Sequence, residues 1–152
     1  MSRAPFNVAV YPYRAVGGGE FEYALLKRRD IGFWQGVSGG GEGDETLLEA
    51  VKRETFEETG IPPDSTFLQL DTVEPIPVTM FGVGNLWGEE TYVIPQHWFG
   101  VSARDRQLVL SREHTEYRWL RYEQAQHLLR YDGNRTALWE LNQRLRGRGP
   151  RG

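Results

Sequence analysis

The stretch from Gly39 to Ile61 constrains this chain more than any other segment, because it concentrates charge at helical spacing. It reads GGGEGDETLLEAVKRETFEETGI and places Arg53, Glu54, Glu57 and Glu58 within six residues. On a helix, Glu54 lies three and four positions from the other two glutamates, so the three carboxylates share one face. Their repulsion costs up to about 1 kcal/mol in an isolated helix. A hard divalent cation with oxygen ligands is the most economical way to offset that cost.

The sequence also marks where this helix begins and ends. Thr46 and Glu49 have the spacing of a capping box, in which each side chain accepts a hydrogen bond from the other residue's backbone N–H. Gly60 is a typical C-terminal stop, and Pro62 and Pro63 cannot continue a helix. We expect its apolar side to consist of either Leu48, Val51 and Thr55 or Leu47, Val51 and Phe56.

Length and composition indicate the class of protein. With 152 residues, 39% of them hydrophobic, the chain is long enough for one domain with a core and too short for two. We expect one domain over residues 1–146 and a basic, disordered tail at 147–152. The net charge of -3 disfavours a nucleic acid polymer or a membrane as partner, but allows a local basic pocket. The lack of cysteine and of long apolar runs fits a cytoplasmic protein, and leaves monomer and homodimer both open.

Strand and helix patterns are mixed along the chain, which indicates an α/β (α+β) fold. Strands are predicted at 6–10, 21–29, 33–38, 67–73, 92–102 and 107–110, and a further strand-like segment follows Glu113. Helices are predicted at 122–130 and 134–146, with Asn134 as the cap of the second and Leu138, Leu141 and Leu145 as its apolar stripe. The interval 74–88 is rich in Pro and Gly, and is the best candidate for a specificity loop.

Prolines and tryptophans give more local expectations. Pro12 should end the first strand or mark an edge, Pro95 should mark an edge or a bulge, and Gly17–Gly19 should form a turn. Trp87, in the irregular interval, is the one tryptophan that we allow to stack on a base. The other tryptophans are expected in the core, namely Trp34, Trp98, Trp119 and Trp139.

The charged and glycine positions of this stretch carry a family resemblance. Gly39, Glu45 and the run Arg53 to Ile61 match G-x5-E-x7-R-E-U-x-E-E-x-G-U, in which U is aliphatic, and so the chain resembles the Nudix hydrolases. The one departure is Thr55 at an aliphatic position, where a small β-branched side chain can still pack. The resemblance implies an α/β/α sandwich with a mixed central sheet. It also implies hydrolysis of a nucleoside diphosphate linked to another moiety, with Mg2+ or Mn2+.

The resemblance and the residues together suggest roles within the site. Glu54, Glu57 and Glu58 are the expected metal ligands, Arg53 should orient one of them by a salt bridge, and the Ser38 carbonyl is a further candidate ligand. The strand at 33–38 should lead into a glycine-rich loop, in which Gly39 lets the backbone approach the metal, and Glu45 should support the helix start or a glutamate. The base that activates water is left open among Glu54, Glu57, Glu113 and Glu116, with Glu54 or Glu113 favoured.

A narrower likeness concerns the residues outside the helix. Arg28-Arg29-Asp30, Phe33-Trp34-Gln35, Glu113-His114 and Asn134-Arg135 are similar to motifs of the bacterial dihydroneopterin triphosphate pyrophosphatases. This likeness implies Glu54, Glu58 and Glu113 as metal ligands and Arg3, Arg28, Ser38 and Gly39 at the substrate. It also gives the basic cluster Lys27–Arg29 a role in neutralising a triphosphate. His114 is expected to be structural or to lie at the edge of the substrate.

These features predict a metal-dependent hydrolase that cleaves a phosphoanhydride bond in a small phosphorylated substrate. The expected substrate is a nucleotide or pterin triphosphate of the dihydroneopterin triphosphate or dATP type, with pyrophosphate as a product. A dinucleoside polyphosphate or nucleotide-sugar pyrophosphatase is the alternative among enzymes. A non-catalytic, nucleotide-sensing Nudix module is the alternative from another class.

Overall fold

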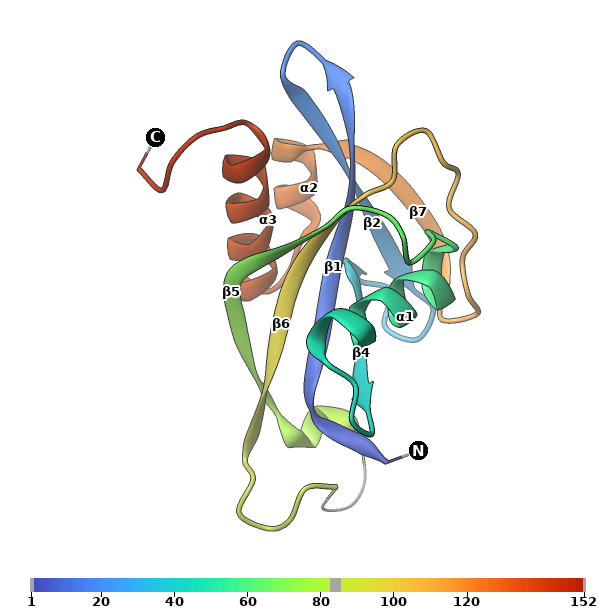
Figure 1. Cartoon of the computed structure of the whole chain (residues 1–152), viewed down its shortest axis with the longest axis vertical. Coiled ribbons are helices and arrows are strands. Elements are labelled where there is room, and N and C mark those ends of the chain that lie inside the picture. The colour runs from blue at the N-terminus through green and yellow to red at the C-terminus, as the bar shows by residue number, and fades with distance from the viewer. Residues whose placement is uncertain (1, 83–85, 152) are drawn as a thin grey trace.

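Strand β1 (Arg3–Gly17) is the centre of the fold, and neighbouring strands pair along both of its edges (Figure 1). The computed structural model describes residues 2–82 and 86–151. The other strands are β2 (Glu20–Arg28), β3 (Trp34–Gln35), β4 (Val37–Glu42), β5 (Phe67–Pro77), β6 (Val93–Ser102) and β7 (His114–Arg121). The helices are α1 (Leu47–Thr59), α2 (Tyr122–Leu128) and α3 (Asp132–Leu145), with a short 3-10 helix η1 at Val78–Phe81.

Within the described residues, seven strands form one mixed sheet. Its main path runs β3-β2-β1-β6-β5, with β4 paired to β1 and β7 paired to β2. The pair β1–β6 is parallel and the other pairs are antiparallel. The hairpin of β1 and β2 turns through Gly18 and Gly19, both at positive φ, as predicted from the glycine run.

The alternation of side chains along β1 creates two cores, one on each face of the sheet. Val8 and Val10 belong to the core under α1, whereas Ala9 and Tyr11 belong to the core under α2 and α3. Helices therefore cover both faces, and α2 and α3 lie side by side (Figure 1). The expected α/β sandwich with a mixed central sheet is confirmed.

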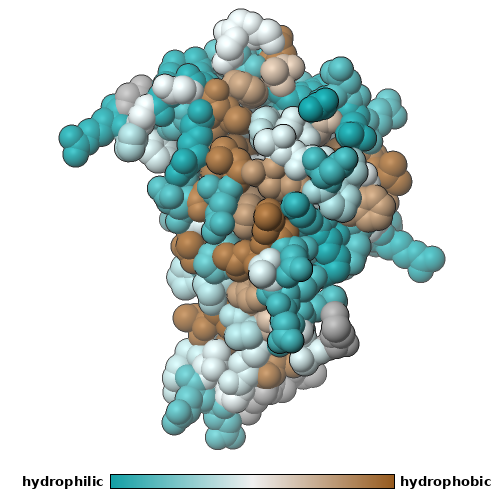
Figure 2. Space-filling model, in the orientation of Figure 1, coloured by the Kyte–Doolittle hydropathy of each residue, from teal (hydrophilic) through white to brown (hydrophobic). Residues whose placement is uncertain are grey.

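Helix α1 begins and ends where the sequence predicts. The Thr46 hydroxyl accepts from Glu49 N at 3.1 Å, Glu49 accepts from Thr46 N at 2.8 Å, and Gly60 caps the C-terminus at φ 78°. Both expected apolar stripes are only partly right, because Leu48 and Phe56 are 45% and 54% exposed. The buried side of α1 consists of Ala50, Val51, Thr55, Glu58 and Thr59. Hydrophilic side chains gather over α1, beside a hydrophobic band over the strands (Figure 2).

Three predictions about strand ends are wrong. Pro12 lies inside β1 and does not end it. Along one edge of β1, pairing with β4 stops at Val10 and pairing with β2 starts at Tyr13, so Pro12 lies between the two. Gly39 to Gly41 belong to β4 rather than to a loop. The segment 107–110 forms no strand, and instead lies along the end of α1, where Val109 N donates to Thr59 O at 2.8 Å.

Other local expectations had mixed outcomes. Pro95 lies on β6, an interior strand, but at a point where only β5 pairs with it. Asn134 does not cap α3; it lies in the first turn of the helix, which starts one residue after Tyr131, and it is buried. The predicted stripe of α3 is confirmed, because Leu138 and Leu141 are buried and Leu145 packs against the same core.

The interval 74–88 is more ordered than its composition suggests. Residues 74–77 complete β5, and η1 follows directly. Positions 83–85 of the predicted specificity loop lie outside the described residues. No helix in residues 2–82 and 86–151 is long and apolar enough to cross a membrane.

Candidate active site

A cavity of about 740 Å3 lies where β4, β1, β6 and β5 run next to one another. Residues from α1, from the start of α3 and from the segment before β7 complete its walls. Six of the residues predicted for the site line it, namely Arg3, Arg28, Ser38, Gly39, Glu54 and Glu113. The structure thus brings together residues from five separate segments of the sequence.

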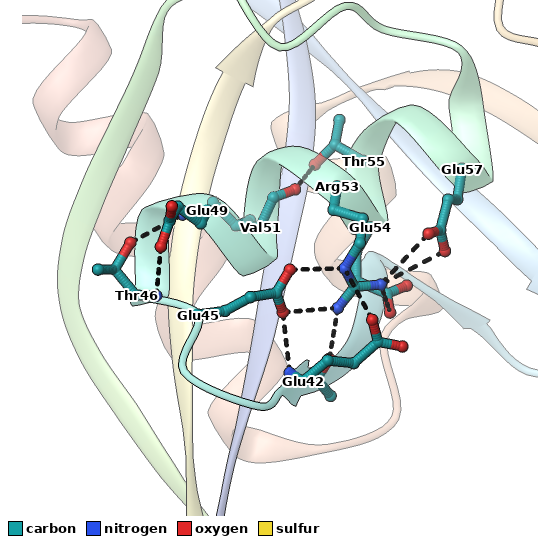
Figure 3. Close-up of polar contacts among 10 residues, drawn as sticks. Glu42, Glu45, Thr46, Glu49, Val51, Arg53, Glu54, Thr55 and Glu57 are labelled. Carbon is teal, nitrogen blue, oxygen red and sulfur yellow. Dashed lines mark hydrogen bonds and ion pairs between the residues drawn. The ribbon is translucent and has the colours of Figure 1, made fainter. Parts of the chain in front are cut away.

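Arg53 gathers acidic side chains around α1 and β4 (Figure 3). Its Nε and Nη2 donate to both carboxylate oxygens of Glu45, at 2.7 and 3.0 Å, and its Nη1 donates to Glu54 Oε1 at 3.0 Å. Nη2 also donates to the Gly40 carbonyl at 2.8 Å, and Nη1 donates to Glu57 Oε1 at 3.3 Å. These bonds, with Glu45 first, raise the pKa of Arg53. Arg53 makes the expected salt bridges, and Glu45 supports Arg53 rather than facing the cavity.

Glu54 is the carboxylate of α1 that lines the cavity. Burial raises its pKa to about 7, against the opposing effect of Arg53 and with a further rise from Glu57 and Glu58. Its position depends on a glycine in β4, because a Cβ at Gly39 would lie 2.0 Å from the Glu54 Cδ. Negative charge at Glu54 is therefore only partly compensated by the protein.

Glu57 and Glu58 point to different surroundings. Glu57 is exposed and contacts Arg53, whereas Glu58 is buried, with a side chain only 7% exposed. Glu58 accepts a hydrogen bond from the Ser111 hydroxyl, and its Oε2 lies 3.2 Å from Nδ1 of His114. Burial lowers the pKa of His114, which favours a neutral imidazole at this contact. His114 also lines the cavity, so it lies between the buried Glu58 and the site.

Glu113 lines the cavity just before β7. Burial raises its pKa, and the negative charge of Glu58 raises it further. Glu116, the other candidate base in this segment, is exposed on β7 and its carboxylate lies 3.6 Å from Arg118 Nε. The structure therefore places Glu113 with Glu54 at the cavity, and leaves Glu116 outside it.

The arginines predicted near the substrate differ in whether they line the cavity. Arg28 lines the cavity and donates from both Nε and Nη2 to the carboxylate of Asp30. Arg29 points to the carbonyl of Arg112, at 2.8 Å, and does not line the cavity. Arg3 lies over the ring of Phe81, with 5.1 Å between its Cζ and the ring centroid. Burial lowers the pKa of Arg3, while the charge of Glu54 acts to raise it.

The tryptophans differ in burial and in whether they line the cavity. Trp98 is buried and lines the cavity, and Trp34 and Trp119 pack against the cores. Trp139 is 42% exposed, so its expected place in the core is wrong. The Trp87 indole donates to the Arg3 carbonyl at 3.0 Å, and its ring meets Phe81 edge to face. Its stacking on a base stays a prediction.

Sequence reasoning missed a set of polar residues on the cavity floor. Asn7, Gln96, Glu74 and Asn134 line the cavity and are joined by hydrogen bonds. The signal that could have found the first two is a polar side chain on the inward face of an otherwise apolar strand. Glu74 carried no such signal, because the sequence gives no clear end for β5.

The donor chemistry of the site fits a hard divalent cation. Glu54, Glu58 and Glu113 offer carboxylate oxygens, and two of them have raised pKa values caused by burial and neighbouring negative charge. Within residues 2–82 and 86–151, no three acidic or histidine side chains are grouped closely enough to hold an ion as they stand.

Comparison with known proteins assigns the class. The family model of the NUDIX domain matches residues 5–140, which include the sheet from residue 5 onward, α1 and all the cavity-lining residues except Arg3. The fold and the glutamate-bearing helix define a hydrolase of phosphorylated small molecules, a class whose members generally use divalent ions such as Mg2+. The chain belongs to the Nudix family and is a pyrophosphohydrolase acting on nucleotide-like substrates.

Named relatives differ in substrate. The chain is 31% identical over 130 residues to an RNA pyrophosphohydrolase of Roseobacter denitrificans, covering 76% of this chain and 81% of the relative. It is 32% identical over 126 residues to the asymmetrical bis(5'-nucleosyl)-tetraphosphatase of Sus scrofa, covering 82% and 80%. It is 28% identical over 116 residues to the dihydroneopterin triphosphate diphosphatase of Escherichia coli K12, covering 75% and 77%. Among solved structures, a NUDIX hydrolase of Listeria monocytogenes has a TM-score of 0.85 and 37% identity, covering 95% and 96%.

Proposed function

We propose that this protein is a divalent-metal-dependent enzyme that cleaves a nucleotide or pterin triphosphate, of the dihydroneopterin triphosphate or dATP type, and releases pyrophosphate. The observation that carries the proposal is the single cavity shared by Glu54, Glu113 and Arg28. A triphosphate needs both the cations and the arginine near its phosphates, and room beside them for a ring. A volume of about 740 Å3 is within the range of sites for ligands of this size.

The metal would be held by Glu54, Glu57, Glu58 and Glu113, with the Ser38 carbonyl as a further ligand. When bound, it supplies positive charge that offsets the charge developing on the phosphoryl oxygens. Arg53 keeps Glu54 and Glu57 in place through the hydrogen bonds already described. This assignment is supported by the oxygen-only donor set and by the uncompensated charge at Glu54.

Glu54 or Glu113 would accept the proton of the attacking water. Both line the cavity, where the phosphates of the substrate would lie. Arg28, Arg3, Ser38 and Gly39 would contact the substrate, with Arg28 the one member of the basic cluster placed to meet its phosphates.

Two alternatives concern the same site. A dinucleoside polyphosphate hydrolase is favoured by the Sus scrofa relative, and a nucleotide-sugar hydrolase would use the same carboxylates. A nucleotide-sensing module without catalysis is disfavoured, because every glutamate of the Gly39–Ile61 stretch is present and Glu54 faces the cavity.

A substrate panel with product identification tests the proposal. Purified protein is incubated with Mg2+ and, separately, with dihydroneopterin triphosphate, the deoxynucleoside triphosphates, diadenosine tetraphosphate, ADP-ribose and a 5'-triphosphorylated RNA oligonucleotide. We expect pyrophosphate and a monophosphate from the triphosphates at the highest kcat/KM. Preferred cleavage of the dinucleotide or the RNA would contradict the proposed substrate, and binding without any product would favour the sensing module.

A further inference from the structure

A row of polar side chains crosses the middle of the sheet at the cavity floor. Gly40, Asn7, Gln96 and Glu74 are successive partners across β4, β1, β6 and β5, so they form a single line on one face. Gly40 makes room in this line for the Arg3 guanidinium, because a Cβ at Gly40 would lie 1.2 Å from Arg3 Nη1. The row therefore has a cation at one end, a carboxylate at the other and two amides between them.

The hydrogen bonds along the row all point the same way. Arg3 Nη2 donates to Asn7 Oδ1 at 3.4 Å, Asn7 Nδ2 donates to Gln96 Oε1 at 2.7 Å, and Gln96 Nε2 donates to Glu74 Oε1 at 3.1 Å. An ionised carboxylate can only accept, so Glu74 requires the amino group of Gln96 and thereby fixes the orientation of both amides. The row is thus a preorganised set of polar groups with a fixed direction.

The two oxygens of Glu74 are used unequally. Oε1 accepts from Gln96, from the Trp98 indole and from Asn134, whereas Oε2 has only the 3.4 Å contact with Asn134. Within the part of the chain that the structure describes, no cationic side chain lies within ion-pair distance of Glu74. Gly133 lies against Oε2, where a Cβ would be 2.1 Å away. Glu74 lines the cavity, and Oε2 is its oxygen with fewer hydrogen-bond partners.

We propose that Glu74 is a specificity-determining residue that recognises a ring with adjacent ring N–H and amino donors, the 2-amino-4-oxopyrimidine edge shared by guanine and pterins. This inference rests on the proposed function and narrows it, because it favours the dihydroneopterin triphosphate type of substrate over the dATP type. Oε2 of the carboxylate, the oxygen with fewer hydrogen-bond partners, accepts the N–H and the amino group. Adenine is disfavoured, because the lone pair of its N1 would face the carboxylate.

Substrate pairs test this inference without any mutation. With Mg2+, the wild-type protein should hydrolyse dGTP with a kcat/KM about 10- to 100-fold higher than dATP, because a charge-assisted hydrogen bond is gained. dITP lacks the 2-amino group, so its kcat/KM should also be lower than that of dGTP. Equal values for dGTP, dITP and dATP, or a preference for dATP, would overturn the inference.

The variant Glu74→Gln completes the test. It should lose most of the difference between dGTP and dITP while changing kcat/KM for dATP far less. Glu123→Gln, at an exposed position on α2, is the matched control and should keep the wild-type pattern. If Glu74→Gln lowered kcat/KM for all three nucleotides by the same factor, Glu74 would have only a structural role. Melting curves of both variants show whether the fold is retained.

Equilibrium binding separates this inference from the proposed function. Calorimetric titration with dGTP, dITP and dATP in EDTA measures ring recognition without turnover, and dGTP should bind most tightly. If hydrolysis fails but this preference holds and is lost in Glu74→Gln, the reaction assignment is wrong and the ring assignment stands. If pyrophosphate is released but neither binding nor kcat/KM distinguishes the rings, the ring assignment is wrong and the proposed function stands.

Discussion

At the residue scale, Arg53 divides its charge among three glutamates, two of them on α1. Arg53 contacts Glu45, Glu54 and Glu57, and Glu45 accepts two of these bonds, including the shortest at 2.7 Å. Glu54 consequently keeps a pKa of about 7. Ionised Glu54 therefore destabilises the metal-free fold, and a bound cation would remove this cost.

This cost leads to a prediction about stability without metal. The pKa of Glu54 in the folded chain lies above its usual 4.5, so its contribution to stability is full below pH 4.5 and is lost as the pH rises through 7. In EDTA at pH 8, the free energy of unfolding of Glu54→Gln should therefore exceed that of the wild type by at most about 3 kcal/mol. Urea denaturation at pH 5 and pH 8 measures the difference, which should shrink at pH 5.

Magnesium provides the control for this measurement. Added Mg2+ should raise the free energy of unfolding of the wild type at pH 8 and leave Glu54→Gln nearly unchanged. A variant that is less stable than wild type at both pH values in EDTA would show that the Arg53 contact outweighs the buried charge.

Glu58 gives a second prediction at this scale. Its buried carboxylate contacts Ser111 and approaches His114, so Glu58→Gln keeps the shape and one acceptor but removes the charge. We expect a loss of turnover of at least about 100-fold with Mg2+, and a melting temperature close to that of wild type. Near-normal kcat would contradict the assignment of Glu58 to the metal, with Glu123→Gln again as the control.

At the scale of elements, β4 makes room for the side chains of Glu54 and Arg3, because it carries adjacent glycines that lack a side chain on one face and then on the other. Gly39 leaves room for Glu54, and the next residue, Gly40, leaves room for Arg3. Adjacent residues of a strand point to opposite faces, so one short strand serves the carboxylate end and the ring end of the cavity. The glycines lie in a strand rather than in the predicted loop because Gly39 and Gly40 pair with Val8 and Asn7 of β1.

Single alanine substitutions in β4 should separate these two roles. Gly39→Ala would displace Glu54 and should lower kcat by about 100-fold or more, whereas Gly40→Ala would displace Arg3 and should chiefly raise KM. Gly149→Ala, which has open space around it, is the control. Steady-state kinetics on one triphosphate distinguish the outcomes, and identical effects of both substitutions would contradict separate roles.

The elements that the sequence predicted well are those with local signals. The capping box and Gly60 fix α1 through bonds within the helix itself, and they needed no knowledge of the sheet. Pro12 misled because its tolerance depends on which strands pair beside it, a property of the tertiary structure. Segment 107–110 misled because an apolar alternation can lie against a helix end as well as in a sheet.

The candidate site was predictable to the extent that it matches a spaced motif. Arg53 and the glutamates follow from the Gly39–Ile61 stretch, and Glu113 follows from a likeness of the segment before β7. The polar row of Asn7, Gln96 and Glu74 was not predictable, because its members meet only through the strand register. Residues that select a ring are brought together by pairing between strands far apart in the sequence, and so leave no local pattern.

At the scale of the whole molecule, the helical layer that contains α3 is joined to the sheet where the register of β5 shifts. The register of β5 with β6 shifts between Gln69 and Val73, which leaves N–H groups without a strand partner. Glu140 of α3 replaces that partner: its carboxylate accepts from Asp71 N at 2.6 Å and from Thr72 N at 2.9 Å. The helix that begins beside the cavity is thereby fixed to the edge of the sheet.

Removing this link should weaken the whole fold in a pH-dependent way. Burial alone would raise the pKa of Glu140, but hydrogen bonds from Asp71, Thr72 and Arg144 outweigh it and hold the pKa below its usual value. Glu140→Ala leaves the two N–H groups without their acceptor, and should lower the free energy of unfolding by about 2–4 kcal/mol at pH 7.

The sign of the pH dependence follows from the lowered pKa. The stability that Glu140 contributes is present above its unfolded pKa, near 4.5, and is lost as the pH falls through the lower folded value. Urea denaturation at pH 7 should therefore show a large gap between wild type and Glu140→Ala, and the gap should narrow below pH 4. Glu123→Ala, exposed on α2, should stay within about 0.5 kcal/mol of wild type. A gap that does not change with pH would mean that packing of the Glu140 side chain, rather than its charge, holds α3 to β5.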